Sequence, residues 1–532
     1  MSFFLEDTKL QIYWEDVIKP YTPRSEIGLE LWKMMKPYEK GQEGEWQKEL
    51  EQIDILVKLF REDKDRMNDF EILFSNYSDV KSLFDKISYN DFKSIEPLFE
   101  GFHLKKFLWF SYSLSKKIIN LVNLKKDLQF DSYVWFKLAN NPWDEWLKFF
   151  NKGQDNRIFY QSFSLKDIDN EILIDLRSEK RKLVLNIKKA KDLIHQQIEN
   201  KYQTTLNYEG NLLVFANDRN LLSLSKDDSL KLIKQSDEHL VFSIIPTVEE
   251  EKLTNRLYEL EALIQSEEKS RITDVLEQIK DLFPLWNEAS TEWGRFELLV
   301  KKAKMALNLN AVRPIMVKGK NNHLIIYKGN HPYLERLLND RKRKMEPINI
   351  EIDHNVTVLY GANMGGKTIA LKTIGLLQAL AQYGFFVPAE KFEFSFVSHI
   401  SIITGDYQNI EAGLSSFGAE IVRLKHDFSH KEALYLMDEI GKGTNPIEGE
   451  ALAIAVLRYL KQQNSLTVLV SHFPKLIEED GVGLYEAKEY KLIRITKGNM
   501  VYEAINQAEI LGLPESIIDE AKKYLVSEDG GK

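Results

Sequence analysis

Residues 361–368, GANMGGKT, contain three glycines, a lysine and a threonine at the spacing G-x-x-x-x-G-K-T. Glycines let consecutive backbone N–H groups close around phosphate oxygens, and a helix that starts after the loop adds the positive end of its dipole. Lys367 is expected to reach the β- and γ-phosphates of ATP, and Thr368 to bind Mg²⁺. The other residues predicted to bind the nucleotide are Gly361, Ala362, Asn363, Met364, Gly365 and Gly366. The structural alternative is a glycine-rich turn between a strand and a helix.

A second candidate site follows downstream, where an apolar run ends in Asp438 and Glu439. At the end of a strand, Asp438 can hold hydrated Mg²⁺, and Glu439 can orient or deprotonate the attacking water. His472, at the end of the next apolar run, is a candidate to contact the γ-phosphate. Two acids at a strand end, or a single histidine, can also be purely structural.

Alternating strands and helices are expected to position these residues. Four apolar runs are typical of strands and lie at 318–329, 355–361, 432–439 and 465–472. Helical spacing is found at 367–384, where Gly384 is expected to end the helix, and at 446–460. Apolar strands that alternate with helices predict a parallel-rich sheet covered by helices on both faces, which is the α/β architecture of a P-loop ATPase domain.

The first 300 residues hold only seven of the 26 glycines, which indicates a mostly helical region. Apolar residues recur at helical spacing in 46–60, 176–202 and 248–283, and Pro284 is expected to end the last of these helices. Between 203 and 247, the runs NLLVFAND, NLLSLS and HLVFSIIPT predict three short strands. Two long helices with a small sheet at their far end would form an arm.

The composition narrows the class of protein. The chain has 532 residues, of which 43% are hydrophobic, and it carries a net charge of −9 and no cysteine. Several folded domains are therefore expected, and disulfides and thiolate metal sites are excluded. The negative charge gives no overall basic surface for nucleic acid, although a local patch can serve. The N-terminus does not have the pattern of a signal peptide and no apolar run predicts a membrane helix, so a cytoplasmic location without membrane contact is expected.

The motifs GANMGGKT and LYLMDEIGKGTNPIEG, with the SHF that follows them, resemble those of the MutS family within the ABC-type ATPase superfamily. Residues 406–420 resemble the family's signature loop, which reaches across a dimer to the partner's nucleotide, and Ser415 matches its serine. KGNHPYLE at 328–335 resembles the entry to the ATPase domain, and 502–525 resembles the helices that hold two ATPases together. The resemblance implies a homodimer that binds and hydrolyses ATP with Mg²⁺.

The resemblance is specific over about 310–525 and looser over the arm, which is similar to the family's lever and clamp. It divides the chain into five predicted segments: a helical N-terminal core (1–125), a helical core with the outgoing lever helix (126–202), a small β-rich, clamp-like insert (203–247), returning lever helices (248–310), and the ATPase domain with C-terminal dimerisation helices (311–532).

The sequence also departs from the family pattern. Ala362 stands where the family has proline and Ile369 where it has a second hydroxyl residue, and neither change removes a phosphate or metal contact. The spacing is closer to the second bacterial class of MutS relatives than to the mismatch-repair class. That class usually carries a C-terminal nuclease domain, and a short form without it is expected here. The wedge pattern Phe-x-Glu occurs by chance at 4–6 and 60–62, outside any α/β domain, so mismatch recognition is not expected.

The partner of this ATPase is left open by the sequence. Seven basic residues at 176–191 are typical of phosphate neutralisation on DNA, but a solvated helix face is an equal alternative. The aromatic-rich stretch 105–117 permits base stacking, although its spacing favours a buried helix. A DNA clamp is the first hypothesis.

The second hypothesis is a protein or ribonucleoprotein partner. Short MutS-like ATPases resemble ones encoded beside clostridial amino-acid-fermentation enzymes, which suggests a chaperone-like factor that reactivates a cobalamin-dependent aminomutase. A catalytically silent module is the third reading, and the intact Lys367, Thr368, Asp438 and Glu439 argue against it.

Overall fold

The computed structural model describes residues 3–89, 94, 96–123, 132–148, 150, 170–317, 323–361, 365–404, 416–488, 491–496, 505, 508–509 and 512–529. The chain divides into two compact units. The first combines Met1–Ser75 with Trp293–Lys532, and the second is Asn76–Glu292. The five predicted segments are finer than this division, and their boundaries stay a prediction.

Helices open the first unit. They are α1 (Glu6–Gln11), α2 (Trp14–Ile18), a 3₁₀ turn (Lys19–Tyr21), α3 (Glu26–Lys33), α4 (Glu43–Glu62) and α5 (Lys64–Phe74). The helix predicted over 46–60 is α4, which buries Trp46, Leu50 and Ile53 along one face. Phe4 and Phe60 are buried as well, so neither Phe-x-Glu match is exposed to insert into a duplex.

The second unit begins with α6 (Lys81–Ser88), α7 (Pro97–Asn123), α8 (Val134–Ala139) and α9 (Trp143–Lys148). The aromatic-rich stretch 105–117 lies within α7, where Phe107, Phe110 and Leu114 are fully buried. Core packing therefore accounts for these side chains, and the buried rings are not available to stack on bases.

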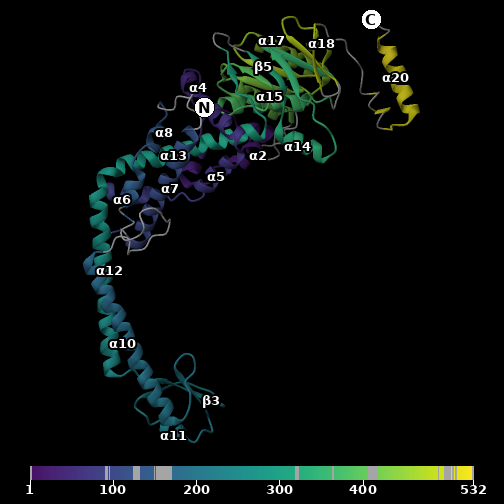
Figure 1. Ribbon diagram of the computed structural model, residues 1–532. Coiled ribbons are helices and arrows are strands. Elements are labelled where there is room, and N and C mark those ends of the chain that lie inside the picture. Colours follow the sequence, from purple (N-terminus) through teal and green to yellow (C-terminus); the bar gives the residue numbers. More distant parts are fainter. Residues whose placement is uncertain are drawn as a thin grey trace. The chain divides into compact units, whose positions relative to one another are not determined.

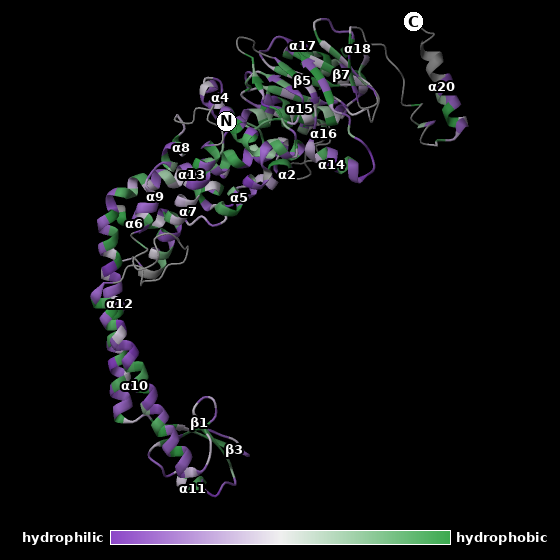
Figure 2. Ribbon diagram, in the orientation of Figure 1, coloured by the Kyte–Doolittle hydropathy of each residue, from purple (hydrophilic) through white to green (hydrophobic). Residues whose placement is uncertain are grey.

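Two long helices, α10 (Glu171–Tyr202) and α12 (Val248–Ile279), run antiparallel beside each other (Figure 1). They cover the two arm helices expected from the apolar spacing. Leu173, Leu260 and Ile264 form a small apolar cluster between them. Hydrophilic and hydrophobic stretches alternate along both helices (Figure 2). A narrow apolar seam flanked by charges therefore holds the two helices together.

A three-stranded antiparallel sheet lies at the far end of this helix pair, in the order β1 (Asn211–Phe215), β3 (His239–Ile244), β2 (Leu230–Gln235). β1 and β3 were expected, but the strand prediction for NLLSLS is wrong. That run contains a short helix, α11 (Leu221–Leu224), and the third strand is β2. Leu221 and Leu224, three residues apart, both contact the apolar cluster beneath the sheet. This helical spacing overrides the strand pattern.

The prediction that Pro284 ends the returning helix is wrong in its position. α12 ends at Ile279, a 3₁₀ turn occupies Lys280–Leu282, and Pro284 lies in the first turn of α13 (Phe283–Asn308). Proline is tolerated there because N–H groups in the first turn have no intrahelical partner.

The α/β part of the first unit is built on a six-stranded sheet. Its spatial order is β13 (Lys491–Ile495), β12 (Gly483–Lys488), β7 (Val356–Gly361), β11 (Leu466–Val470), β10 (Leu434–Asp438) and β9 (Ile400–Thr404). All neighbours are parallel except the edge strand β13. One face is covered by α17 (Pro446–Lys461) and α18 (Pro474–Ile477), and α15 (Lys367–Gln382) packs on the other. The parallel-rich sheet and its three predicted strands are thus confirmed.

A second sheet was not expected, apart from one of its strands. Its order is β4 (Ile315–Met316), β8 (Lys391–Phe394), β5 (Leu324–Gly329) and β6 (Ile348–Ile352). β5 pairs antiparallel with both neighbours and belongs to the strand predicted at 318–329, whose residues 318–322 lie outside the described residues. α15 contacts β5 as well as the larger sheet, so it lies between the two sheets.

Three further helices complete the described chain. They are α14 (Pro332–Asp340), α16 (Ser416–Asp427) and α20 (Glu515–Asp529). Gly384, with φ of +71°, follows the end of α15 as predicted. The closing helices predicted at 502–525 are described only in part. Within the described chain, no helix has both the length and the apolar character needed to cross a membrane.

Candidate functional site

Glycines shape the turn between β7 and α15. Gly361 has φ of +125°, and a Cβ at this position would collide with the carbonyl oxygen of Ala487. Gly366, preceded by Gly365, has φ of +91° and is the N-cap of α15. Glycine adopts such backbone angles readily, whereas other residues are strained there. The predicted nucleotide contacts of Ala362, Asn363 and Met364 fall outside the described residues.

The first turn of α15 meets the end of β10. Thr368 Oγ1 donates a hydrogen bond to Asp438 Oδ2 at 2.7 Å. The side chain of Lys367 is buried, and its Nζ donates to the carbonyl oxygen of Gly361 at 2.5 Å. Burial raises the pKa of Asp438, against the effect of the Thr368 hydrogen bond. Two segments that lie 70 residues apart in sequence are thus brought into direct contact.

Glu439 follows in the left-handed backbone region, with φ of +59°. Its carboxylate contacts two basic side chains: His472 Nε2 lies 2.5 Å from Oε1, and Lys442 Nζ contacts Oε2. The hydrogen bond with His472, supported by the one with Lys442, lowers the pKa of Glu439 to about 2. Glu439 is therefore ionised across the neutral range. His472, which we expected at the γ-phosphate, here holds the carboxylate of Glu439.

Sequence reasoning misses two residues at this site. Lys442 lies three residues after Glu439, so the tight turn GKG was an available signal for their contact. Glu420 of α16 accepts a hydrogen bond from the backbone N–H of Gly441 at 2.8 Å, and no spacing in the sequence indicates this contact. Ser415, the predicted serine of the signature loop, lies outside the described residues.

The oxygen atoms at this site fit Mg²⁺ bound together with a nucleotide. Mg²⁺ binds few protein oxygens and completes its shell with water and phosphate. The Thr368 hydroxyl and the Asp438 carboxylate, 2.7 Å apart, are ligands of this kind. The turn at Gly361 and Gly366 presents backbone without a Cβ, as close approach to phosphates requires. Among the described residues, no group of three or more His, Asp or Glu side chains could hold a metal by itself.

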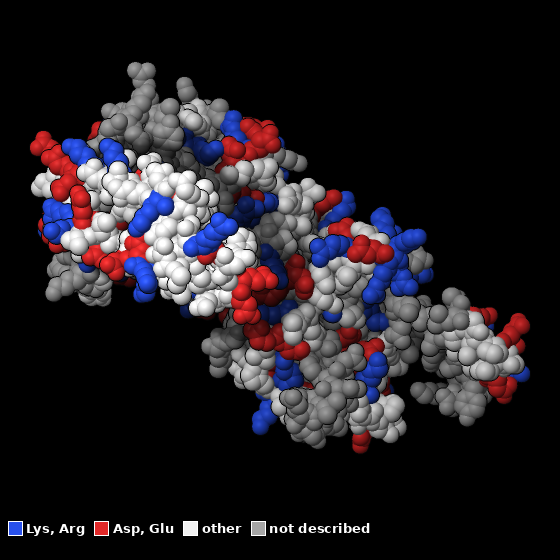
Figure 3. All heavy atoms as spheres, turned by 90° about the horizontal axis from the view of Figure 1, so that it is seen from below, with Lys and Arg blue, Asp and Glu red and all other residues white. Residues whose placement is uncertain are grey.

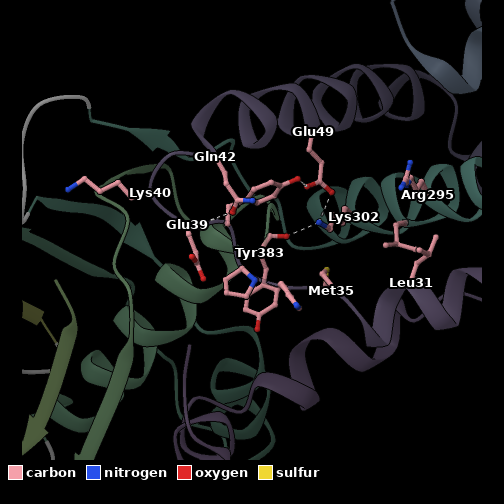
Figure 4. Close-up of a pocket in the computed structure, with 13 residues that line it drawn as sticks. Leu31, Met35, Glu39, Lys40, Gln42, Glu49, Arg295, Lys302 and Tyr383 are labelled. Atoms are coloured by element: carbon pink, nitrogen blue, oxygen red, sulfur yellow. Dashed lines mark hydrogen bonds and ion pairs between the residues drawn. The ribbon is translucent and has the colours of Figure 1, made fainter. Parts of the chain in front are cut away.

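A cavity of about 480 Å³ lies near the opposite end of α15 (Figure 4). Lys302 of α13 donates to Glu49 Oε1 and to the Tyr383 carbonyl, both at 2.7 Å, and the Tyr38 hydroxyl donates to Glu49 Oε2 at 2.6 Å. None of the predicted site residues lines it. The lining residues are Leu31, Met35, Lys36, Pro37, Tyr38, Glu39, Lys40, Gln42, Glu49, Arg295, Leu298, Lys302 and Tyr383.

The seven basic residues at 176–191 of α10 divide into two groups. Acidic residues of α12 pair with three of them, in Arg177–Glu268 (2.8 Å), Lys180–Glu261 (2.8 Å) and Lys191–Glu250 (3.5 Å). The exposed cations that form no ion pair with a described residue are Arg181, Lys182, Lys188 and Lys189. Basic and acidic side chains are interspersed on the face shown in Figure 3. The solvated-face reading thus explains part of the cluster, and four cations stay accessible.

This site lies in a part of the chain that is similar to known proteins. Residues 357–527 match the family model of MutS domain V. Three similar curated relatives are each named Endonuclease MutS2. The one from Acetivibrio thermocellus is 28% identical over 404 residues, which is 71% of this chain and 49% of the relative. The one from Fusobacterium nucleatum is 29% identical over 405 residues, or 71% and 49%. The one from Finegoldia magna is 30% identical over 403 residues, or 70% and 48%.

The chain spans about half the length of the curated relatives it matches. The matched domain includes the glycine turn, the paired acids at the end of β10 and the histidine after β11. The domain V match and the similarity to MutS2 proteins together support membership of this chain in the MutS family.

Proposed function

We propose that this protein is a dimeric, MutS-like ATPase that uses ATP binding and hydrolysis to change the conformation of its arm on DNA. The observation that carries the ATPase proposal is the 2.7 Å hydrogen bond between Thr368 and Asp438. It joins the glycine turn to the end of β10, so that a phosphate loop and an acidic pair face one site. The domain V match and the MutS2 relatives support the same conclusion.

When bound, ATP with Mg²⁺ supplies the phosphoanhydride bond and the cation that offsets its charge. In this proposal, Lys367 binds the β- and γ-phosphates, and Thr368 and Asp438 hold the cation. Glu439 orients the attacking water. His472 and Lys442 each engage one carboxylate oxygen of Glu439. Because a carboxylate oxygen can accept more than one hydrogen bond, Glu439 keeps acceptor capacity for that water.

The dimer in this proposal rests on the signature loop. Ser415 would contact the nucleotide of the partner subunit, and the helices at 502–525 would hold the two ATPase domains together. Hydrolysis would then depend on closure of two chains over two nucleotides.

DNA is the proposed partner because four exposed cations on α10 carry no acidic partner among the described residues. Arg181, Lys182, Lys188 and Lys189 lie within nine consecutive positions of one helix. Such a cluster neutralises backbone phosphates without reading sequence, which gives salt-sensitive binding. The relatives are named Endonuclease MutS2, which supports a role on DNA. The net charge of −9 gives the chain no overall basic surface, so the proposal relies on this local patch.

The experiment that tests this function measures Mg²⁺-dependent ATP turnover by the purified chain, with and without duplex or branched DNA. We expect turnover that requires Lys367, and DNA binding that weakens steeply between about 50 and 200 mM salt. A chain that hydrolyses ATP but does not bind DNA would support the ATPase proposal and exclude DNA as the partner.

A protein partner is the second candidate, favoured by the surface of the three-stranded sheet. The segment 203–247 carries four basic and six acidic residues. Leu213 and Phe215 of β1 are 51% and 61% exposed on its outer face. An apolar, acidic surface is poorly suited to a polyanion and suits a protein. A chaperone-like role toward a metabolic enzyme such as a cobalamin-dependent aminomutase is the specific form of this candidate. Co-purification of that enzyme with this chain, together with a lack of DNA binding, would favour the protein partner over DNA.

A further inference from the structure

Glu420 is a buried carboxylate next to the proposed hydrolytic site. It lies on α16, the helix that follows the segment resembling the signature loop, and only 3% of the residue is exposed. Its Oε1 accepts the backbone N–H of Gly441 at 2.8 Å. Burial raises the pKa of Glu420, and the Gly441 hydrogen bond opposes this rise. A carboxylate is costly to bury, so its position requires a reason beyond packing.

The donor of this contact, the backbone N–H of Gly441, lies on the turn that carries Glu439. Glu439 and Gly441 both have left-handed backbone angles, with φ of +59° and +81°. The backbone N–H of Glu439 is held by the carbonyl oxygen of Val470 at 3.0 Å, and that of Lys442 points to the Glu439 carbonyl oxygen at 3.4 Å. A left-handed residue other than glycine persists only when its surroundings hold it. The Glu420–Gly441 hydrogen bond is one of the contacts that hold this turn.

The helix that carries Glu420 is itself firmly attached. Asp427, at the end of α16, is fully buried and accepts hydrogen bonds from Arg423 Nε at 2.8 Å and from the hydroxyl of Ser401 on β9. Arg423 also donates to the Thr8 hydroxyl of α1 at 3.1 Å. α16 is therefore fixed to the sheet, and Glu420 holds the turn from a rigid support.

We infer that Glu420 is a positioning residue for hydrolysis, which fixes the turn at Gly441 and thereby aims the carboxylate of Glu439 at the attacking water. This inference rests on the proposed ATPase function. Small displacements of a catalytic group cost large factors in rate, so loss of the acceptor is expected to act on kcat rather than on nucleotide binding.

The test compares two substitutions of similar size in the full chain. Glu420→Met removes the hydrogen-bond acceptor, whereas Glu420→Gln keeps a carbonyl oxygen that can accept from Gly441. We expect kcat for ATP to fall at least about 10-fold in Glu420→Met and to stay within about 3-fold in Glu420→Gln. Affinity for a non-hydrolysable ATP analogue should change by less than about 3-fold in both variants. Val422→Ala, an exposed position on the same helix, is the matched control.

Each other outcome overturns the inference. Unchanged kcat in Glu420→Met, or equal losses in the Met and Gln variants, would show that the acceptor is not what matters. A parallel loss of nucleotide affinity, or failure of both Glu420→Met and Glu420→Ala to fold, would assign Glu420 to domain stability. Absence of ATP turnover in the unsubstituted chain would overturn the proposed function, and this inference with it.

Discussion

Glu439 is the residue on which hydrolysis depends in this proposal. Its pKa of about 2 ensures a negative charge at neutral pH, but a carboxylate of such low pKa is a weak base. We therefore assign it the orientation of water more than the removal of a proton. His472 and Lys442, which set this pKa, also control how freely the carboxylate can turn.

Replacing Glu439 with Gln should separate binding from turnover. The amide keeps the shape of the side chain but loses the charge that orients water, so kcat is expected to fall by about 10²–10⁴-fold. Affinity for ATP with Mg²⁺ should stay within about 3-fold, because Lys367, Thr368 and Asp438 are unchanged. Steady-state turnover and equilibrium binding measure the two effects. Glu448→Gln, the same change at an exposed nearby position, is the control. Unchanged turnover in Glu439→Gln would show that Glu439 does not orient the attacking water.

The contact between His472 and Glu439 predicts a pH effect. The pKa of Glu439 is lowered in the folded chain, so the pair contributes stability above the unfolded pKa of about 4.3, and this is lost as pH falls toward about 2. Replacing His472 with Ala removes the largest cause of the lowering. We expect the acid limb of kcat/KM for ATP to move to higher pH, toward about 4.

The control for this pH effect is Lys475→Ala, which removes a cation that pairs with Glu450 instead of Glu439. Profiles recorded between about pH 3 and 8 would test the shift. Superimposable acid limbs in the His472→Ala variant and the unsubstituted chain would contradict it.

At the residue scale, the sequence motifs could predict which residues come together at the site, but not which of them contact one another. The phosphate-loop spacing and the acids at a strand end follow from backbone geometry, so Thr368 and Asp438 were accessible from sequence. The pairing of Glu439 with His472 depends on which strands are neighbours in the sheet. The contact of Glu420 with Gly441 depends on how α16 packs, and no local pattern encodes that packing.

At the scale of elements, the central strands of the six-stranded sheet carry buried hydroxyl groups. Thr467 of β11 is fully buried, and its Oγ1 makes no hydrogen bond within the described chain. A buried hydroxyl without a partner costs stability, whereas valine has nearly the same shape and suits a strand. Thr467→Val should therefore stabilise the first unit by about 1 kcal/mol.

Thermal unfolding would measure this gain as a rise of about 2 °C in the midpoint of that unit. Thr373→Val is the control, because the Thr373 hydroxyl donates to the carbonyl oxygen of Ile369 at 2.7 Å and its loss should not stabilise. A lower midpoint for Thr467→Val would mean that its hydroxyl has a partner.

The arm gives a prediction about DNA. Lys188 and Lys189 are exposed on α10 and form no ion pair with a described residue. If they contact phosphates, the double variant Lys188→Ala, Lys189→Ala should weaken binding to any duplex sequence and lower the slope of log K against log salt by about 2.

Titrations at several salt concentrations would give this slope. Lys33→Ala, Lys36→Ala makes the same change in net charge at exposed positions in the other unit and should leave the slope unaltered. Equal slopes in both double variants would show that this stretch of α10 does not bind DNA.

Element types were predictable where the apolar pattern is long, and less so where it is short. The α10 and α12 patterns extend over several turns, and the core strands β7, β10 and β11 are continuously apolar. β2, with the sequence LKLIKQ, alternates over only three residues before Ile233 breaks the pattern, so little marks it as a strand. The second sheet was missed because its strands pair across distant parts of the sequence, as β4 does with β8.

At the scale of the whole molecule, the proposal joins an ATPase site in one unit to an arm in the other. The chain passes between the two units at two places in the sequence, after Ser75 and after Glu292, and the second of these lies within α13. Binding energy at the phosphates can act on the arm only if two conformations differ in their affinity for nucleotide. The proposed coupling between the ATPase site and the arm therefore depends on whether the chain binds ATP at the predicted site.

The most direct test is calorimetric titration of the purified chain with a non-hydrolysable ATP analogue and Mg²⁺. We predict saturable binding at about one site per chain, which is abolished by Lys367→Ala and weakened when Mg²⁺ is withheld. No binding by the unsubstituted chain, or equal binding by the Lys367→Ala variant, would contradict the proposed nucleotide site at residues 361–368 and 438–439.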